Sequence, residues 1–474
     1  MNRSKSAAAG LVFAIFAFPA VAFAARVSDV QDTDFWEQAT RFFDWGDPHN
    51  GRYLMELTIG CALVGLCCGL LSAFIVVRRI ALVGDMLSHA ILPGIVLGFL
   101  WTATKNPVHL LIGAVTAGLV GAALATGLKR TTTLKDDTNF GIVLGGFYAV
   151  GIFLMSMIQN GNFGDQSGIG EILLGSAAAM RTADIKLIAV VAAVSVIVIG
   201  LLFKEFKASS FDPSFANTIG IKERGMHYLL MGLLSFVVVI SIQAVGALLV
   251  TAMLIIPAAT ATLLTHRLEI VILLAVLFGM VASVGGAYFS FLHQGLPTGA
   301  LMILTGSFGF SLAFIFAPER GLLPRKLRRK RQAARIQREN TLKAIFHLLE
   351  AAGFESDRVT FADLTARRRR GESEVRREFQ NLARHGLVEL NGASLRLTDA
   401  GLTRAKEIVR NHRLWELYLT HSADIAADHV HDDAEKIEHV LGENVVRLLE
   451  QRFGAEAIDP HGKTIPAAAG GSAS

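Results

Sequence analysis

Long apolar runs separated by short polar loops occupy most of the chain between residues 53 and 317. A helix needs about 20 apolar residues to cross the hydrocarbon core of a bilayer. Nine stretches meet or approach that length: residues 55–77, 80–101, 108–128, 140–158, 186–203, 226–243, 245–264, 269–291 and 297–317. The pattern predicts a mainly α fold in which residues 55–317 form a polytopic membrane helix bundle of about nine spans.

Basic residues follow alternate spans of this predicted bundle. Loops rich in Lys and Arg stay on the cytoplasmic side of a membrane protein. An odd number of spans with the N-terminus outside then places the C-terminal region in the cytoplasm. The basic positions are Arg78, Arg79, Lys129, Arg130, the segment 204–224, His266, Arg267 and the segment 320–331.

The N-terminus has the pattern of a secretory signal peptide, residues 1–24. Arg3 and Lys5 precede a short apolar stretch, and small residues at 22 and 24 suit signal peptidase. The alternative is an uncleaved additional helix, but the apolar stretch is short for a span, so cleavage is favoured. Residues 25–54 then form a periplasmic segment whose aromatic side chains suit the membrane surface: Phe35, Trp36, Phe42, Phe43 and Trp45.

The chain changes character after residue 317 and reads as soluble. Residues 318–338 form a basic linker helix, which favours contact with anionic lipid over contact with nucleic acid. Residues 339–398 show three helices and a hairpin through Asn391 and Gly392, typical of a small winged helix-turn-helix. A helical domain follows at 399–466, and residues 467–474 form a low-complexity, disordered tail.

Composition supports a membrane protein with a soluble appendage. The 474 residues are 52% hydrophobic and only 18% charged, which excludes an ordinary soluble protein. The three cysteines lie in one apolar segment without the spacing of a zinc ribbon or a disulfide framework. We expect Cys61, Cys67 and Cys68 to serve as small packing residues.

Ionisable side chains inside the predicted bundle mark the candidate chemistry. Asp85 and His89 are four residues apart, so a helix places both on one face. Counted from the start of the span, His89 lies about 15 Å into a core of about 30 Å. A carboxylate and an imidazole suit a borderline divalent ion, and two copies in a dimer would give four ligands. The alternative is a polar contact between helices.

Residues 78–90, with Pro93 and Gly94, resemble the permeases of zinc-, manganese- and iron-type ABC importers. The resemblance continues through segments 210–213, 220–221, 245–259 and 296–300. It implies a bacterial inner-membrane permease that works as a homodimer or heterodimer, with Asp85 and His89 in the metal pathway. It also implies that the segment 206–225 docks on an ATPase, through residues that include Phe211, Asp212, Pro213 and Gly220.

The chain has no phosphate-binding loop of the Gly-x-x-x-x-Gly-Lys-Ser/Thr type. We therefore expect a separate ABC ATPase subunit to supply ATP hydrolysis, so that the chain is a transport subunit and not an enzyme. We also expect a periplasmic metal-binding protein to deliver the ion.

A second candidate metal site lies in the C-terminal helical domain. His412 and Glu416 are four residues apart, and a second row of His and Glu shares one helical face. Such ligands without thiolates favour manganese or iron and also suit zinc, whereas the alternative is a solvated charged face. The second row is His431, Glu435, Glu438 and His439.

Residues 410–416, 430–440 and 459–466 resemble the diphtheria-toxin-repressor and manganese-regulator family. The resemblance runs from about residue 339 to 466 and implies a one- or two-metal sensor site in a dimerising domain. Its ligands would be His412, Glu416, His431, Glu435, Glu438 and His439. The chain departs from the family in its first helix, where Asn340 and Lys343 replace acidic or soft ligands, which puts a two-metal site in doubt.

The third helix of the winged domain, residues 372–385, is the candidate DNA-reading helix. Arg376, Arg377 and Arg384 could meet phosphates, although three glutamates share the helix. The favoured function is ATP-driven import of manganese, zinc or iron, with a cytoplasmic metal sensor that regulates it. The alternative is a membrane-tethered, metal-dependent, DNA-binding transcription regulator, which would not need Asp85 and His89.

Overall fold

The computed structural model describes residues 40, 42–46, 48, 51–102, 107–160, 175, 177, 180–247, 249–292, 296–368, 371–422, 443–453, 458–459 and 461–466. The chain divides into two compact units, Met1–Pro324 and Arg325–Ser474. The predicted signal peptide and tail lie outside the described residues, as does much of the segment 25–54.

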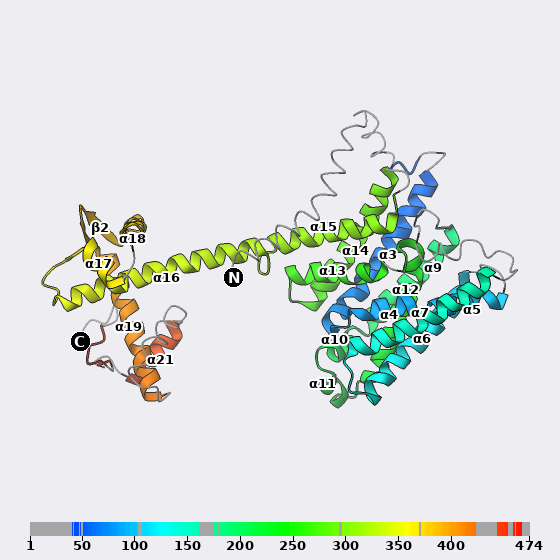
Figure 1. Cartoon of the computed structure of the whole chain (residues 1–474), viewed down its shortest axis with the longest axis horizontal. Coiled ribbons are helices and arrows are strands. Elements are labelled where there is room, and N and C mark those ends of the chain that lie inside the picture. The colour runs from blue at the N-terminus through cyan, green and yellow to red at the C-terminus, as the bar shows by residue number, and fades with distance from the viewer. Residues whose placement is uncertain are drawn as a thin grey trace. The chain divides into compact units, whose positions relative to one another are not determined.

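The first unit is a bundle of apolar helices (Figure 1). Among the described residues, eight stretches are long and apolar enough to cross a membrane. A further apolar helix, α13 (Val250–Leu264), lies where residues 245–264 were expected to span. Its 15 residues reach about 22 Å, less than a core of about 30 Å. The eight are Gly51–Arg78, Leu82–Trp101, Val108–Thr131, Asp136–Ile158, Thr182–Leu201, Glu223–Ile242, Leu268–Leu292 and Thr298–Phe316.

Helix α3 (Gly51–Arg78) is largely buried and packs against α9 (Thr182–Leu201), α12 (Glu223–Val245), α13 and α14 (Leu268–Leu292). Glycines allow the closest of these contacts. A Cβ added at Gly65 would lie 2.4 Å from the carbonyl oxygen of Gly279 on α14, so the two backbones touch there. The three cysteines are buried in α3 without disulfides, which confirms that they act as packing residues.

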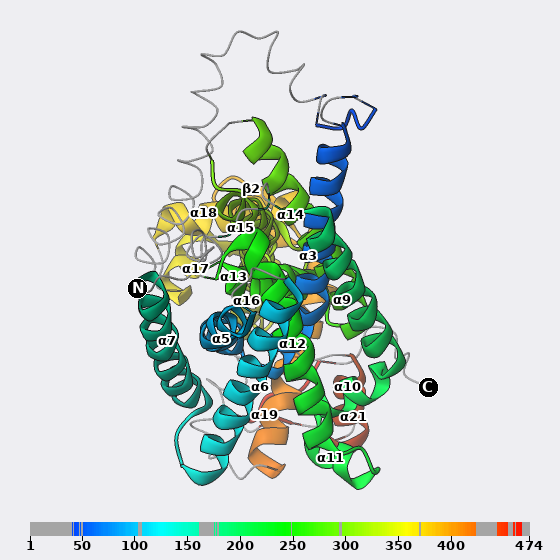
Figure 2. The same ribbon diagram turned by 90° about the vertical axis from the view of Figure 1, so that its right-hand side faces the viewer.

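The second predicted span consists of two helices, α4 (Leu82–Ala90) and α5 (Leu92–Thr102), with a turn at Ile91. Pro93 explains the interruption, because it has no N–H to donate to the carbonyl of His89. Helix α4 packs against α6 (Pro107–Thr131), α7 (Asp136–Asn160), α12 and α13. Figure 2 shows α7 at the outside of the bundle, beside α5 and α6.

Polar contacts join the helix ends on one face of the bundle. Arg78, at the end of α3, donates to Ser209 and Ser210 of α10 (Phe203–Phe211). Lys207 of α10 pairs with Glu269 at the start of α14. Beyond the end of α15 (Thr298–Phe316), Arg320 donates to the carbonyl of Thr262 and to His266. The ends of α3, α13 and α15 therefore share a face with several of the basic loops.

The second unit contains a winged helix. Helices α16 (Leu322–Ala351), α17 (Phe361–Arg368) and α18 (Glu372–Arg384) accompany strands β1 (Arg358–Thr360), β2 (Val388–Asn391) and β3 (Ser394–Leu397). The sheet order is β1-β3-β2, and the predicted hairpin is confirmed, with Asn391 opposite Ser394 and Gly392 at positive φ. Thr360 and Asp363 exchange the hydrogen bonds of a capping box.

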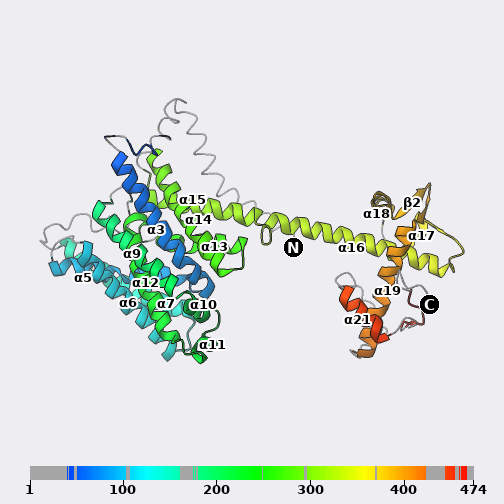
Figure 3. The ribbon, with the colours of Figure 1, turned by 180° about the vertical axis from the view of Figure 1, so that it is seen from behind.

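Helix α16 joins two predicted segments, because the basic linker and the first winged-domain helix run as one helix. Its C-terminal half supplies Leu342 and Ile345 to a core with Phe379, Leu382 and Val409. After the wing the chain forms α19 (Asp399–Ser422) and α21 (Glu443–Phe453), which pack side by side (Figure 3). The core therefore fixes α16 against α19, the two helices that carry the polar site described below.

Candidate functional site

Asp85 and His89 lie on one face of α4, as their spacing predicts. His89 Nε2 is 3.6 Å from Asp85 Oδ1, and the side chains are 12% and 38% exposed, respectively. The other ring nitrogen, His89 Nδ1, is buried and has no hydrogen-bond partner among the described residues. A carboxylate and an imidazole with an unused nitrogen can both contribute to binding a divalent ion.

Neighbouring helices pack closely around this part of α4. The ring of Tyr148 on α7 meets the His89 ring edge-on, with centroids 5.0 Å apart. On the other side of the turn, a Cβ added at Gly84 would lie 3.3 Å from the Leu254 side chain and 3.5 Å from Thr251 of α13. Sequence reasoning missed Tyr148, because nothing in its local pattern distinguishes it from other aromatic residues in spans.

The predicted ATPase-docking residues lie around a helical corner. Asp212 accepts a hydrogen bond from the Phe215 N–H at 2.9 Å and so caps α11 (Pro213–Thr218), whose first residue is Pro213. Gly220 has φ +87°, a conformation that favours glycine. Phe211, Phe215 and Ile219 expose their apolar side chains around this corner.

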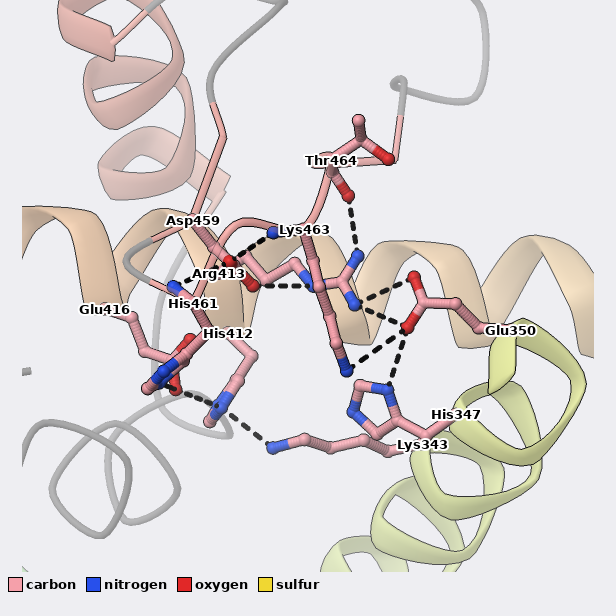
Figure 4. A network of polar contacts seen from close by, with 10 residues as sticks. All are labelled: Lys343, His347, Glu350, His412, Arg413, Glu416, Asp459, His461, Lys463 and Thr464. Carbon is pink, nitrogen blue, oxygen red and sulfur yellow. Dashed lines mark hydrogen bonds and ion pairs between the residues drawn. The ribbon is translucent and has the colours of Figure 1, made fainter. Parts of the chain in front are cut away.

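In the second unit, His412 and Glu416 are both buried and in contact. His412 Nε2 is 2.9 Å from Glu416 Oε1. His412 Nδ1 is 2.9 Å from the ammonium nitrogen of Lys343, which α16 contributes (Figure 4). His461 reaches Glu416 more loosely, at 3.9 Å. Both nitrogens of His412 are therefore engaged by protein groups, so the described residues do not fit a metal ion on this imidazole.

A second set of ion pairs surrounds Arg413, whose side chain is 2% exposed (Figure 4). Its guanidinium donates to both carboxylate oxygens of Glu350, at 2.9 and 2.7 Å, and to the Thr464 carbonyl at 2.6 Å. It also lies 3.3 Å from Asp459. Asp459 in turn accepts from the backbone N–H groups of His461 and Lys463. Arg413 thus fastens the segment 458–466 to α16 and α19.

Two groups in this network have shifted pKa values: Glu350 and His347, whose Nδ1 lies 3.4 Å from the Glu350 carboxylate. Burial alone would raise the pKa of Glu350, but the hydrogen bonds and charge of Arg413 outweigh burial and hold it below the usual 4.5. Burial lowers the pKa of His347 to about 4, against the opposing effect of its hydrogen bond to Glu350. At neutral pH the network therefore contains an ionised Glu350 beside an uncharged His347.

The remaining predicted residues divide into two groups. Arg376, Arg377 and Arg384 are exposed on α18, whereas Glu378 of the same helix is buried and pairs with Arg368. The predicted ligands His431, Glu435, Glu438 and His439 lie outside the described residues. Within the described ranges, no three His, Cys, Asp or Glu side chains are placed to hold a metal ion together.

Sequence reasoning did not identify the ion pairs of Arg413. Its partners Glu350 and Asp459 lie 63 and 46 positions away, so no local pattern connects them. The resemblance of residues 459–466 to the diphtheria-toxin-repressor and manganese-regulator family is the feature of the sequence that marks this segment.

Two family models match the chain. The ABC 3 transport family matches residues 51–317. The iron dependent repressor, metal binding and dimerisation domain matches residues 398–467. The two matches fall within the two compact units.

Known proteins resemble the chain over long stretches. The manganese transport system membrane protein MntC of Bacillus subtilis is 35% identical over 395 residues, which cover 82% of this chain and 90% of the relative. The zinc transport system membrane protein TroC of Treponema pallidum is 37% identical, over 59% of this chain and 93% of the relative.

A solved structure resembles more than half of the chain. The structure described as PsaBC from Streptococcus pneumoniae in complex with Fab has a TM-score of 0.54 and 33% identity. The match covers 60% of this chain and 99% of that chain. The chain therefore belongs to the ABC 3 transport family, and a domain of the iron-dependent-repressor type follows its permease.

Proposed function

We propose that the chain is the permease subunit of an ATP-driven importer that carries Mn²⁺, with Asp85 and His89 as transient ligands of the ion. The observation that carries the proposal is the buried Nδ1 of His89, which has no hydrogen-bond partner in the described part of the chain and lies one helical turn from a carboxylate. Ionisable groups at membrane depth are expensive and mark ion pathways. Relatives named for manganese and for zinc transport support a divalent cargo.

Uptake of ⁵⁴Mn²⁺ into proteoliposomes that contain the permease, its ATPase and the metal-binding protein tests this proposal. Asp85→Asn and His89→Ala should each reduce the initial rate by a factor of about 10 or more, since each removes one of few ligands. Asp136→Asn is a matched control, because Asp136 lies at the start of a span and pairs with an exposed lysine. Full uptake by both variants would refute the ligand role, and competition by Zn²⁺ would measure the selectivity.

We further propose that the corner between α10 and α11 docks on a separate ATPase. Phe211 and Phe215 are 61% and 56% exposed, and the Asp212 cap with Pro213 fixes their direction. An apolar projection on a polar face suits insertion into a groove of a partner. Phe215→Asp should abolish co-purification of the ATPase with the permease, whereas Leu134→Asp, at an exposed apolar residue in the loop between α6 and α7, should retain it.

The face of the bundle that carries the contacts of Arg78, Lys207 and Arg320 also indicates the orientation of the chain in the membrane. Several of the basic loops, the α10–α11 corner and the start of α16 lie at helix ends that polar contacts join. By the positive-inside rule this face is cytoplasmic, in the inner membrane of a bacterium. The C-terminal unit would then be cytoplasmic, and a periplasmic metal-binding protein and a second permease subunit would complete the importer. Labelling of an engineered cysteine at Ser356 from only the cytoplasmic side would test the orientation.

For the C-terminal unit we propose regulation of transport from the cytoplasm. DNA binding is the second candidate, and the exposure of Arg376, Arg377 and Arg384 on α18 favours it. Electrophoretic mobility shift of the detergent-solubilised chain with its own upstream DNA separates the two candidates. A shift lost in Arg377→Ala would support DNA reading, whereas altered transport after deletion of residues 354–474, without any shift, would support regulation.

A further inference from the structure

The ammonium group of Lys343 lies inside the polar site of the C-terminal unit. Lys343 is 7% exposed, and its Nζ is 2.9 Å from His412 Nδ1 (Figure 4). A lysine ammonium has three donors and no acceptor, so it must donate in this contact. His412 Nδ1 therefore presents its lone pair to Lys343.

This arrangement determines the role of the second imidazole nitrogen. With Nδ1 as the acceptor, Nε2 of a neutral ring carries the proton and donates to Glu416 Oε1 at 2.9 Å. Glu416 is 2% exposed, so its charge is withdrawn from water. The three side chains form a buried series of cation, neutral imidazole and carboxylate. A metal ion needs a lone pair of the imidazole, which it could obtain only by displacing Lys343 or Glu416.

The charges around the site also disfavour a divalent ion at His412. The described network contains three cationic side chains and three carboxylates that lie close together (Figure 4). A divalent ion at His412 would add two positive charges beside a buried ammonium and would repel it. The cations are Lys343, Arg413 and Lys463, and the carboxylates are Glu350, Glu416 and Asp459.

Lys343 also joins two helices of the unit, as a structural metal ion does in other proteins. It belongs to α16 and His412 to α19, 69 positions apart, so their contact joins two helices of the unit. We propose that Lys343 is a built-in cation that takes the place of a divalent ion at His412, so that α16 and α19 are held together without metal. This goes beyond the proposed transport and regulation, and the match to a metal-binding domain family does not predict it.

Binding of Mn²⁺ alone to the full chain in detergent, counted by equilibrium dialysis with elemental analysis, tests the proposal. The wild type and His412→Ala should bind the same number of ions, because His412 holds none. Loss of about one equivalent in His412→Ala would overturn the proposal. The membrane pair contributes equally to both proteins, so the comparison does not depend on the transport function.

A variant of Lys343 should bind more Mn²⁺ than the wild type, and a folding defect cannot produce such a gain. Lys343→Glu replaces the ammonium with a carboxylate beside His412 and should add about one equivalent of bound Mn²⁺. The double variant Lys343→Glu, His412→Ala should lose that added equivalent. Lys326→Glu, at an exposed position on the same helix, is the matched control and should add none. Failure of Lys343→Glu to bind more Mn²⁺ than the control would overturn the proposal.

Discussion

Removal of the Arg413 side chain should destabilise the C-terminal unit severely. The guanidinium makes two hydrogen bonds to Glu350, one to the Thr464 carbonyl and an ion pair with Asp459. Arg413→Ala leaves Asp459, whose side chain is 3% exposed, and the partly buried Glu350 without their main counter-ion. Breaking a buried ion pair by removing one partner costs about 3–5 kcal/mol.

Part of this cost is offset by the contacts that remain. Asp459 keeps the backbone N–H groups of His461 and Lys463, and Glu350 keeps Lys463 at 3.8 Å. We therefore expect the lower part of the range, about 3 kcal/mol. For a unit of this size that loss lowers the melting temperature by roughly 10 °C.

The assay must report on the C-terminal unit within the full chain. Hydrogen exchange of peptides from α16 and α19, followed over a temperature series in detergent, meets this need because it resolves the signal by segment. Arg396→Ala is the control, because Arg396 pairs with Asp357 on an exposed surface. Exposed pairs contribute only about 0–1 kcal/mol. Equal melting temperatures for Arg413→Ala and Arg396→Ala would refute the reasoning.

Three further predictions concern other parts of the chain. The C-terminal unit should lose roughly 3 kcal/mol of stability as pH falls from 6.5 to about 4, because the unfolded state takes up the proton that folded His347, with its lowered pKa, does not. Urea unfolding of His347→Gln should lack this slope, and an unchanged slope would contradict the assignment. Gly94→Val should abolish the monodisperse peak in size-exclusion chromatography, since a Cβ there would lie 2.0 Å from the Gly113 carbonyl oxygen; Gly127→Val, in open space, should keep the peak. Arg78→Ala should weaken metal-stimulated ATP hydrolysis in the assembled importer, because its hydrogen bonds hold α10; full stimulation would exclude this coupling role.

Local periodicity was sufficient to predict most of the helices but not their interruptions. The apolar run at 80–101 looks continuous, yet Pro93 divides it into α4 and α5. The run at 245–264 yields only the 15 residues of α13, because the chain turns at Gly246, which has φ +95°. Conversely, the predicted boundary at residue 338 falls inside α16, since the basic linker continues in register into the apolar face. Apolar periodicity identifies a helical segment, whereas proline and glycine geometry decides where each helix ends.

The two histidine–carboxylate pairs show why local spacing does not identify a metal ligand. Asp85 with His89, and His412 with Glu416, have the same four-residue separation, and both pairs are in contact in the structure. The difference is a third group from elsewhere in the chain. His89 keeps an unpartnered nitrogen among the described residues, whereas Lys343, 69 positions before His412, occupies the second nitrogen of that ring. An imidazole binds a metal ion through a lone pair on one ring nitrogen. Whether it can do so therefore depends on which group faces its second nitrogen, and that group comes from a distant segment of the chain. If both proposals hold, the same local pattern serves ion passage in the membrane and metal-free assembly in the C-terminal unit.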